Sequence, residues 1–88
     1  MAEKEFEIIN RLGLHARAAA QFVQLAGKFS AEVFVEKDDL DVNGKSIMGI
    51  LMLAAPKGSL IKVRTEGADA EEALAAIGQL INDKFGEE

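Results

Sequence analysis

The chain has 88 residues, 49% of them hydrophobic, with no cysteine, one histidine and a formal net charge of −5. This length supports one modest hydrophobic core, so we expect residues 1–88 to form a single domain. The absence of cysteine excludes disulfide bonds, a thiol nucleophile and thiolate metal sites, and a single histidine disfavours a zinc site. The negative net charge disfavours nucleic-acid binding, which depends on neutralising phosphates, so we expect no nucleic-acid partner. We also expect no metal and no other cofactor.

The sequence carries no sign of membrane insertion or export. No apolar run approaches the length of a membrane span. The first ten residues, MAEKEFEIIN, lack the basic start and apolar stretch of a signal peptide. We therefore expect a cytoplasmic protein that does not insert into membranes.

The first half of the chain contains one helical pattern and three strand patterns. Residues 5–9, EFEII, alternate acidic and apolar side chains before becoming fully apolar, which predicts a strand. Apolar side chains recur at helical spacing over residues 16–26, which predicts a helix with one buried face. EVFVE at residues 32–36 and LDV at residues 40–42 are separated by a short turn, and both predict strands.

The second half begins with a turn at Asn43–Gly44 and continues with two helices around a strand. Ser46 precedes the apolar run IMGILMLAA, residues 47–55, as a favoured N-cap, and Pro56 cannot continue that helix. LIKVRT, residues 60–65, alternates as a strand does, and a long amphipathic stripe from Ala70 to Phe85 predicts the last helix. The order β-α-β-β-α-β-α, with short antiparallel strands and helices on one face, indicates an open two-layer sandwich of the α+β class.

The charges are unevenly placed along the chain. Residues 8–31 and 42–65 contain none of the fifteen carboxylates but hold seven of the ten basic residues, namely Arg11, Arg17, Lys28, Lys45, Lys57, Lys62 and Arg64. If the two blocks meet in space, they form one locally positive region suited to an anion. Chance clustering in a short chain explains the same pattern about equally well.

Ser46 has a structural and a functional interpretation. As an N-cap, its hydroxyl accepts a hydrogen bond from an early helix N–H, which stabilises the helix by roughly 1 kcal/mol over alanine. The helix behind it is apolar almost all round, so a small two-layer domain cannot bury all of it. We expect Ile47, Met48 and Leu51 to form an exposed apolar patch beside Ser46, which is typical of a docking surface.

His15 is the only imidazole, and it lies where the first helix begins. A lone histidine is usually a hydrogen-bonded structural residue. Here, however, Gly13 and Leu14 have no capping oxygen, so the first helix N–H groups are free to bind an anion. Arg17 can add a planar fork of donors, and no carboxylate lies near in sequence. An imidazole at such a site can itself accept a phosphoryl group.

Two motifs, GLHARAAAQFV and VNGKSIMGILMLA, resemble the HPr family, the histidine-containing phosphocarriers of the bacterial phosphoenolpyruvate-dependent sugar phosphotransferase system. The resemblance extends over nearly the whole chain. It implies an open-faced β-sandwich, with a four-stranded antiparallel sheet and three helices on one face. It further implies a stoichiometric carrier with a phosphohistidine intermediate, not an enzyme.

The same resemblance implies roles for particular residues and partners. His15 would be phosphorylated on Nδ1 by phosphorylated enzyme I and would pass the group to sugar-specific enzyme IIA components. Arg17 and the backbone N–H groups of Ala16 and Arg17 would stabilise the phosphoryl group. Ser46 matches a regulatory site for an ATP-dependent HPr serine kinase. The partner-binding residues would be Ala20, Ile47, Met48 and Leu51.

The chain departs from the family pattern at Ala18, where the family usually has proline. Alanine is an excellent helix former, so we expect the helix to persist, with a less rigid start. Two alternatives to a monomeric sugar-system carrier stay open. One is a regulatory or nitrogen-branch HPr paralogue that acts by protein–protein interaction. The other is a small RNA-binding domain, which the acidic balance and the absence of tyrosine and tryptophan disfavour.

Overall fold

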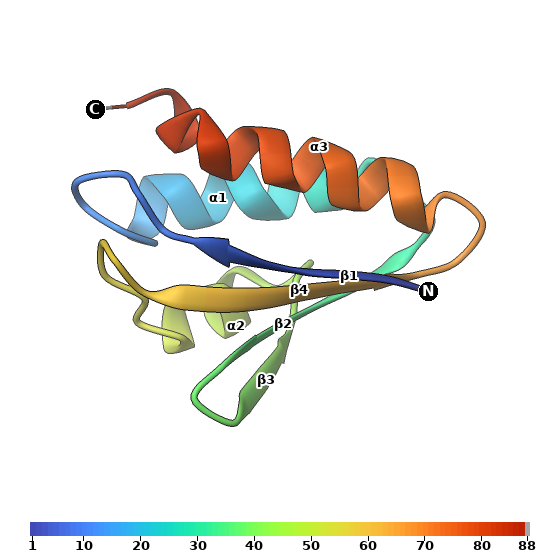
Figure 1. Cartoon of the computed structure of the whole chain (residues 1–88), viewed down its shortest axis with the longest axis horizontal. Helices are drawn as coiled ribbons and strands as arrows, with labels where there is room; N and C mark the ends of the chain where they lie inside the picture. The colour runs from blue at the N-terminus through green and yellow to red at the C-terminus, as the bar shows by residue number, and fades with distance from the viewer. Residues whose placement is uncertain (88) are drawn as a thin grey trace.

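The computed structural model describes residues 1–87. In chain order its elements are β1 (Ala2–Glu7), α1 (Ala16–Ala26), β2 (Glu32–Lys37), β3 (Leu40–Asn43), α2 (Ile47–Met52), β4 (Leu60–Glu66), α3 (Ala70–Asn82) and a 3-10 turn η1 (Lys84–Gly86) (Figure 1). The order confirms the predicted β-α-β-β-α-β-α arrangement. Within residues 1–87, no helix is long and apolar enough to cross a membrane.

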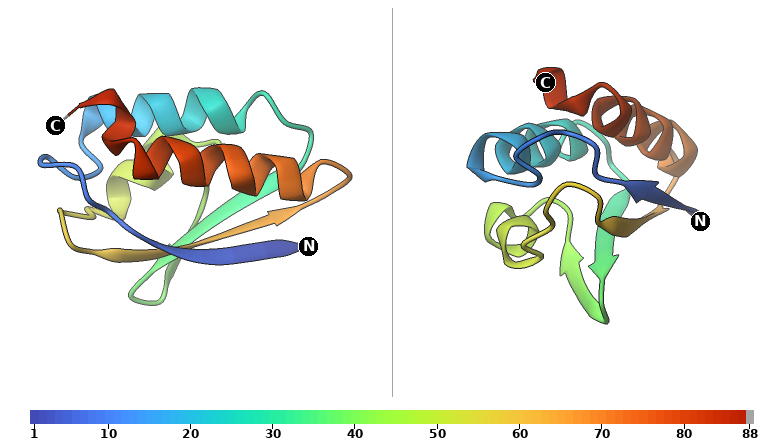
Figure 2. Two further views of the ribbon diagram at one scale, coloured as in Figure 1. Left: turned by 45° about the horizontal axis from the view of Figure 1, so that its top comes forward. Right: turned by 60° about the vertical axis from the view of Figure 1, so that its left-hand side comes forward.

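The four strands form one antiparallel sheet in the order β1-β4-β2-β3. The helices lie on one side of this twisted sheet, and α1 and α3 run side by side across it (Figure 2). The predicted open-faced α+β sandwich is confirmed. Because the other face of the sheet carries no helix, only one face of each strand contributes to the core.

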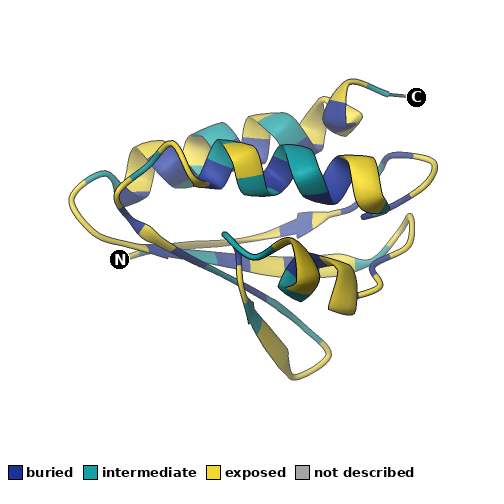
Figure 3. Cartoon of the chain, turned by 180° about the vertical axis from the view of Figure 1, so that it is seen from behind, coloured by how far each residue is buried: buried dark blue, intermediate teal, exposed yellow. Residues whose placement is uncertain are grey.

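The core lies between the sheet and the helices. Along β4, Ile61, Val63 and Thr65 are buried and alternate with less buried neighbours, as the LIKVRT pattern predicts. The helices bury the faces that they turn toward the sheet, whereas α2 remains mostly exposed (Figure 3). Phe22 from α1 and Ile77 from α3 are fully buried in this layer.

The first strand lies earlier than its sequence pattern predicts. The alternation indicates residues 5–9, but β1 pairs with β4 from Ala2 opposite Thr65 to Glu7 opposite Leu60. Ile8 leaves the strand, although it stays fully buried and bonds to Ser59 O and Gly58 N–H. Pairing with β4 decides which residues form β1. The alternation within one strand does not show where its partner strand begins and ends.

Two helices end earlier than predicted. The apolar run predicts a helix over residues 47–55, but α2 ends at Met52, and Ala54 adopts a left-handed conformation with φ 49°. This turn lets Ala55 O accept the N–H of Leu14 at 2.9 Å. The stripe predicted from Ala70 to Phe85 likewise overruns α3, because Phe85 is buried from a left-handed turn beyond the helix.

Asp69 joins the start of α3 to the loop before β2. Its carboxylate accepts hydrogen bonds from Ser30 N–H at 2.9 Å and Ala31 N–H at 2.7 Å. The bond from Ser30 is the main cause of a lowered pKa of Asp69, and the bond from Ala31 and the charge of Lys45 act in the same direction. The ionised form therefore stabilises the fold.

We predict that Asp69→Ala destabilises the protein at neutral pH and less so in acid. Because the pKa of Asp69 is lowered on folding, the stabilisation is present above the ordinary value of 3.8 and disappears as pH falls through the folded-state pKa. Urea unfolding from about pH 7 to about pH 2 measures it. Glu72→Ala, on an exposed position in the first turn of α3, is the matched control. An equal loss of stability at all pH values would contradict the prediction.

Candidate functional site

The first turn of α1 offers unoccupied backbone donors. His15 is its N-cap, in an extended conformation with φ −75° and ψ 179°, and no side chain caps the helix. The N–H groups of Ala16, Arg17 and Ala18 find no acceptor among residues 1–87. The prediction of free donors beside His15 is confirmed, and the helix starts at Ala16 despite the alanine at position 18. Such a helix start attracts an anion through its dipole and its free donors.

The loop before α1 is fixed by backbone contacts that place His15 at the rim. Leu14 is buried and donates its N–H to Ala55 O. Gly13 precedes it with φ 68°, and a Cβ at this position would lie 2.5 Å from Ala55 O. Only glycine tolerates both the left-handed conformation and this close approach. The His15 side chain itself is 28% exposed, so a partner can reach it.

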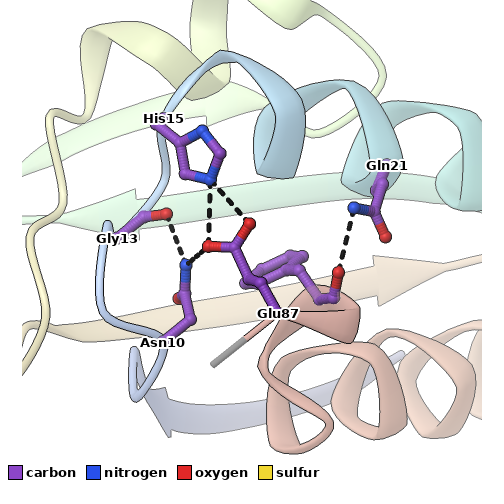
Figure 4. A network of polar contacts seen from close by, with 6 residues as sticks. Asn10, Gly13, His15, Gln21 and Glu87 are labelled. Carbon is purple, nitrogen blue, oxygen red and sulfur yellow. Dashed lines mark hydrogen bonds and ion pairs between the residues drawn. The ribbon is translucent and has the colours of Figure 1, made fainter.

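The imidazole of His15 contacts a carboxylate from the other end of the chain. Its Nε2 lies 2.9 Å and 3.0 Å from the two carboxylate oxygens of Glu87, which is 72 residues away (Figure 4). Asn10 Nδ2 donates to the same carboxylate at 2.8 Å and to Gly13 O at 2.8 Å. The sequence shows no acid near His15, so local spacing gives no sign of this long-range partner.

The contact determines which ring nitrogen carries the proton. The hydrogen bond from Asn10, then that from His15 and the charges of His15 and Arg17, lower the pKa of Glu87 against the opposing effect of desolvation. An ionised carboxylate only accepts hydrogen bonds, so Nε2 of His15 must be the donor. In the neutral ring, the lone pair then lies on Nδ1. This nitrogen bonds to none of the residues 1–87 and lies on the opposite side of the ring (Figure 4).

Two arginines line a hollow that also borders Glu87. Arg11 and Arg17 line a hollow of about 280 Å³ together with Leu12 and Glu87. Arg17 is exposed and makes no ion pair with any of residues 1–87. The positive region is smaller than the charge spacing predicts, because Arg64 lies on the sheet and contacts Asp41 and Glu66.

Ser46 and its apolar neighbours lie on α2, which packs against α1. Ser46 is the predicted N-cap, and its hydroxyl accepts the N–H of Gly49 at 3.1 Å. Ile47, Met48 and Leu51 are 41%, 66% and 37% exposed, which confirms the predicted patch. Met52, at 62%, extends it. Ala20 is half-buried on α1.

The predicted residues therefore gather at two helix starts on neighbouring helices. His15, Ala16 and Arg17 form the first, and Ser46 with the apolar patch forms the second. The start of α1 lies beside the segment that follows α2, because Leu14 N–H bonds to Ala55 O, whereas Lys45, just before Ser46, bonds to Phe29 O beyond the end of α1. Within the part of the chain described, no group of three or more histidine or acidic side chains is arranged to hold a metal ion. The arrangement suits an anion that comes and goes at His15, next to an apolar surface.

Known proteins share both the sequence and the fold of this chain. Residues 2–83 match the family described as "PTS HPr component phosphorylation site". The chain belongs to the HPr family. A phosphocarrier protein HPr from Neisseria meningitidis is 56% identical over 87 residues, covering 99% of this chain and 98% of that protein. An HPr crystal structure from Thermoanaerobacter tengcongensis superposes with a TM-score of 0.97 at 55% identity, covering 100% and 99% of the two chains.

HPr proteins are phosphoryl carriers of the phosphotransferase system and are not catalysts, so membership assigns this chain a carrier role. Their partners are phosphotransferase-system proteins such as enzyme I and enzyme IIA. The family also includes a relative of another type. The HPr-like protein Crh of Halalkalibacterium halodurans is 51% identical over 77 residues, covering 88% of this chain and 92% of that protein.

We predict that Gly13→Ala lowers the free energy of unfolding by at least about 2 kcal/mol. The new Cβ would meet Ala55 O at 2.5 Å and Pro56 Cα at 2.9 Å, so the backbone pairing next to His15 must shift. Chemical denaturation measures the loss. The control is Gly58→Ala, where φ is 93° but nothing lies within 4 Å, so that it reports the conformational cost alone. Equal losses in the two variants would refute a role for the close approach.

Proposed function

We propose that this HPr protein accepts a phosphoryl group on Nδ1 of His15 from phosphorylated enzyme I and passes it to enzyme IIA components. The observation that carries the proposal is the position of His15 at a helix start whose N–H groups of Ala16, Arg17 and Ala18 have no acceptor among residues 1–87. These donors can hold the oxygens of a phosphoryl group while the adjacent Nδ1 attacks it.

The transfer needs little covalent machinery. The Nδ1 lone pair forms a bond to phosphorus as the bond between phosphorus and the donor's leaving atom breaks, and that bonding pair returns to the donor. Catalysis of such transfers is mostly positioning and stabilisation of the charge on the equatorial oxygens. The guanidinium of Arg17, which forms no ion pair with residues 1–87, and the backbone N–H groups supply that stabilisation. The reverse sequence delivers the group to the next acceptor.

We assign partner recognition to the exposed face of α2 and the adjacent part of α1. Ile47, Met48 and Leu51 offer an apolar contact area, and Ala20 on α1 is small enough to allow close approach. The helix start that carries His15 belongs to α1, and the segment just after α2 borders it through the bond from Leu14 N–H to Ala55 O. We expect the protein to be cytoplasmic. We also expect it to act as a monomer, because this surface must stay open for successive partners.

We further propose that Ser46 is a regulatory site for an ATP-dependent HPr serine kinase. Phosphorylation would add about −1.5 to −2 charges at a helix N-terminus, which the dipole tolerates, so the fold should persist. The same charge beside the apolar patch would oppose the docking of an acidic partner. The modification would therefore reduce phosphorylation of His15 by weakening association.

A second candidate is a regulatory or nitrogen-branch role by protein–protein interaction alone. The similarity to the HPr-like protein Crh supports this second candidate. In that case Ser46 would carry the signal and His15 would not transfer phosphate. The phosphorylation assay below separates the two candidates.

We predict that phosphoenolpyruvate and enzyme I place one acid-labile, base-stable phosphoryl group on the protein. His15→Ala should lose this modification completely, because no other side chain in the described chain is an imidazole. Mass spectrometry before and after brief acid treatment measures it. The folded state of the variant is checked by circular dichroism. Persistence of the modification in His15→Ala, or its absence from the native protein, would reject the carrier proposal.

We predict that Ser46→Asp weakens binding to enzyme I by about tenfold or more, equivalent to about 1.4 kcal/mol. Calorimetric titration measures the affinity, and thermal unfolding should change little because aspartate is also a favoured N-cap. Ser46→Asn is the matched control, since it keeps a capping side chain without the charge. Unchanged affinity in Ser46→Asp would count against regulation by charge.

A further inference from the structure

The last described residues, 84–87, fold back over the start of α1. Lys84, Phe85 and Gly86 have φ values of 58°, 55° and 75°, so three successive left-handed residues reverse the chain. Two of the three are not glycine, and this conformation costs energy that surrounding contacts must offset. Contacts with the rest of the molecule must therefore hold this segment in place.

Phe85 anchors this reversal. Its side chain is 2% exposed and belongs to the main hydrophobic core. Its carbonyl oxygen accepts a hydrogen bond from Gln21 Nε2 of α1 at 3.0 Å (Figure 4). Chain ends are usually poorly ordered unless they are tied down in this way. Glu87 therefore starts from a fixed point and turns toward His15.

Asn10 also fixes the carboxylate of Glu87, by a hydrogen bond to one of its oxygens. The Asn10 side chain is fully buried, and its Nδ2 group donates both to Gly13 O and to Glu87 Oε1. A flipped amide would place the Asn10 oxygen against the carboxylate, where both groups are acceptors. The two acceptors, Gly13 O and the Glu87 carboxylate, therefore set the amide orientation together. Asn10 also holds the loop that carries His15, so loop and carboxylate are tied together.

We propose that Glu87 is a positioning residue for phosphoryl transfer at His15, aligned by Asn10 and by the Phe85 anchor. This inference rests on the proposed function. By accepting the Nε2 proton, Glu87 holds the ring in one orientation and in the tautomer whose lone pair is on Nδ1. A carboxylate behind the catalytic histidine of serine hydrolases fixes ring and tautomer in the same way.

The contact also matches the charge that develops during transfer. As Nδ1 bonds to phosphorus, the ring becomes positive, and this charge is shared by Nε2–H, which lies 2.9 Å from a Glu87 oxygen. When the phosphoryl group leaves, the N–P bonding pair returns to Nδ1. The Nε2 proton stays in place in both directions, so no proton enters or leaves the site.

The carboxylate and the phosphoryl group are kept on different sides of the ring. Glu87 faces Nε2, whereas Nδ1 lies opposite (Figure 4). Arg17 lines the hollow that Glu87 borders, and its positive charge acts on the Glu87 carboxylate. This charge offsets the repulsion between Glu87 and an incoming phosphate. Both anions can therefore occupy the site together.

The test compares Glu87→Gln with the native protein. Glutamine keeps an acceptor oxygen but removes the charge. We expect phosphoryl transfer from enzyme I to slow by roughly 10- to 100-fold, the range typical when the hydrogen-bonded partner behind a metal-bound histidine is removed. We also expect ¹⁵N NMR of the unphosphorylated protein to show a smaller excess of the Nε2–H tautomer of His15. A purely structural role for Glu87 would leave the tautomer populations unchanged.

Glu72→Gln is the matched control, since it removes the same charge from an exposed position in the first turn of α3. It should behave like the native protein in both measurements. If Glu87→Gln matches the native protein in rate and tautomer, the inference is wrong while the carrier proposal stands. A faster rate in Glu87→Gln would also overturn the inference and would identify Glu87 as an inhibitor of phosphoryl transfer. If the native protein is not phosphorylated at all, the carrier proposal itself fails.

Discussion

The backbone pairing between the loop after β1 and the segment after α2 holds this site together. Ile8 exchanges hydrogen bonds with Gly58 and Ser59, and Leu14 N–H reaches Ala55 O. These bonds join two segments far apart in sequence, and they place His15 at the rim, at the first turn of α1. Glycine at position 13 allows the approach. Without this pairing, the free donors of α1 and the imidazole would have no fixed relation to each other.

The site balances two opposite electrostatic demands. The first N–H groups of α1 and the guanidinium of Arg17 pair with no acceptor among residues 1–87, so they attract a phosphate. Ordinary acidic surroundings would repel it. The chain as a whole carries −5, yet its two long acid-free segments supply the local sequence of the site. Among residues 1–87, the carboxylate that enters the site is that of Glu87, which contacts Nε2 and leaves Nδ1 open. An anionic group can thus assist the imidazole without occupying the place of the phosphate.

The two helix starts differ in a way that suits two kinds of phosphorylation. At α1 the N-cap is an imidazole that makes no capping bond, so the donors stay available for a transient group. At α2 the N-cap hydroxyl of Ser46 already satisfies Gly49 N–H, and the helix behind it exposes Met48 and Met52. Charge added at the second start would alter a docking surface without touching the imidazole. Phosphorylation at His15 and phosphorylation at Ser46 can therefore act on two neighbouring helices of one small protein.

Local features of the sequence determined the order of the elements, the open sandwich, the Ser46 cap and the placement of His15 at an uncapped helix start. Each depends on periodicity or on a side chain within one turn of its partner. The tertiary structure decided where β1 pairs, where α2 ends, that Phe85 is buried outside α3, and that Glu87 reaches His15. The physical reason is that these features join residues that are far apart in sequence and meet only when the sheet and helices pack. A contact over 72 residues leaves no mark in local spacing, even though it decides which ring nitrogen carries the proton.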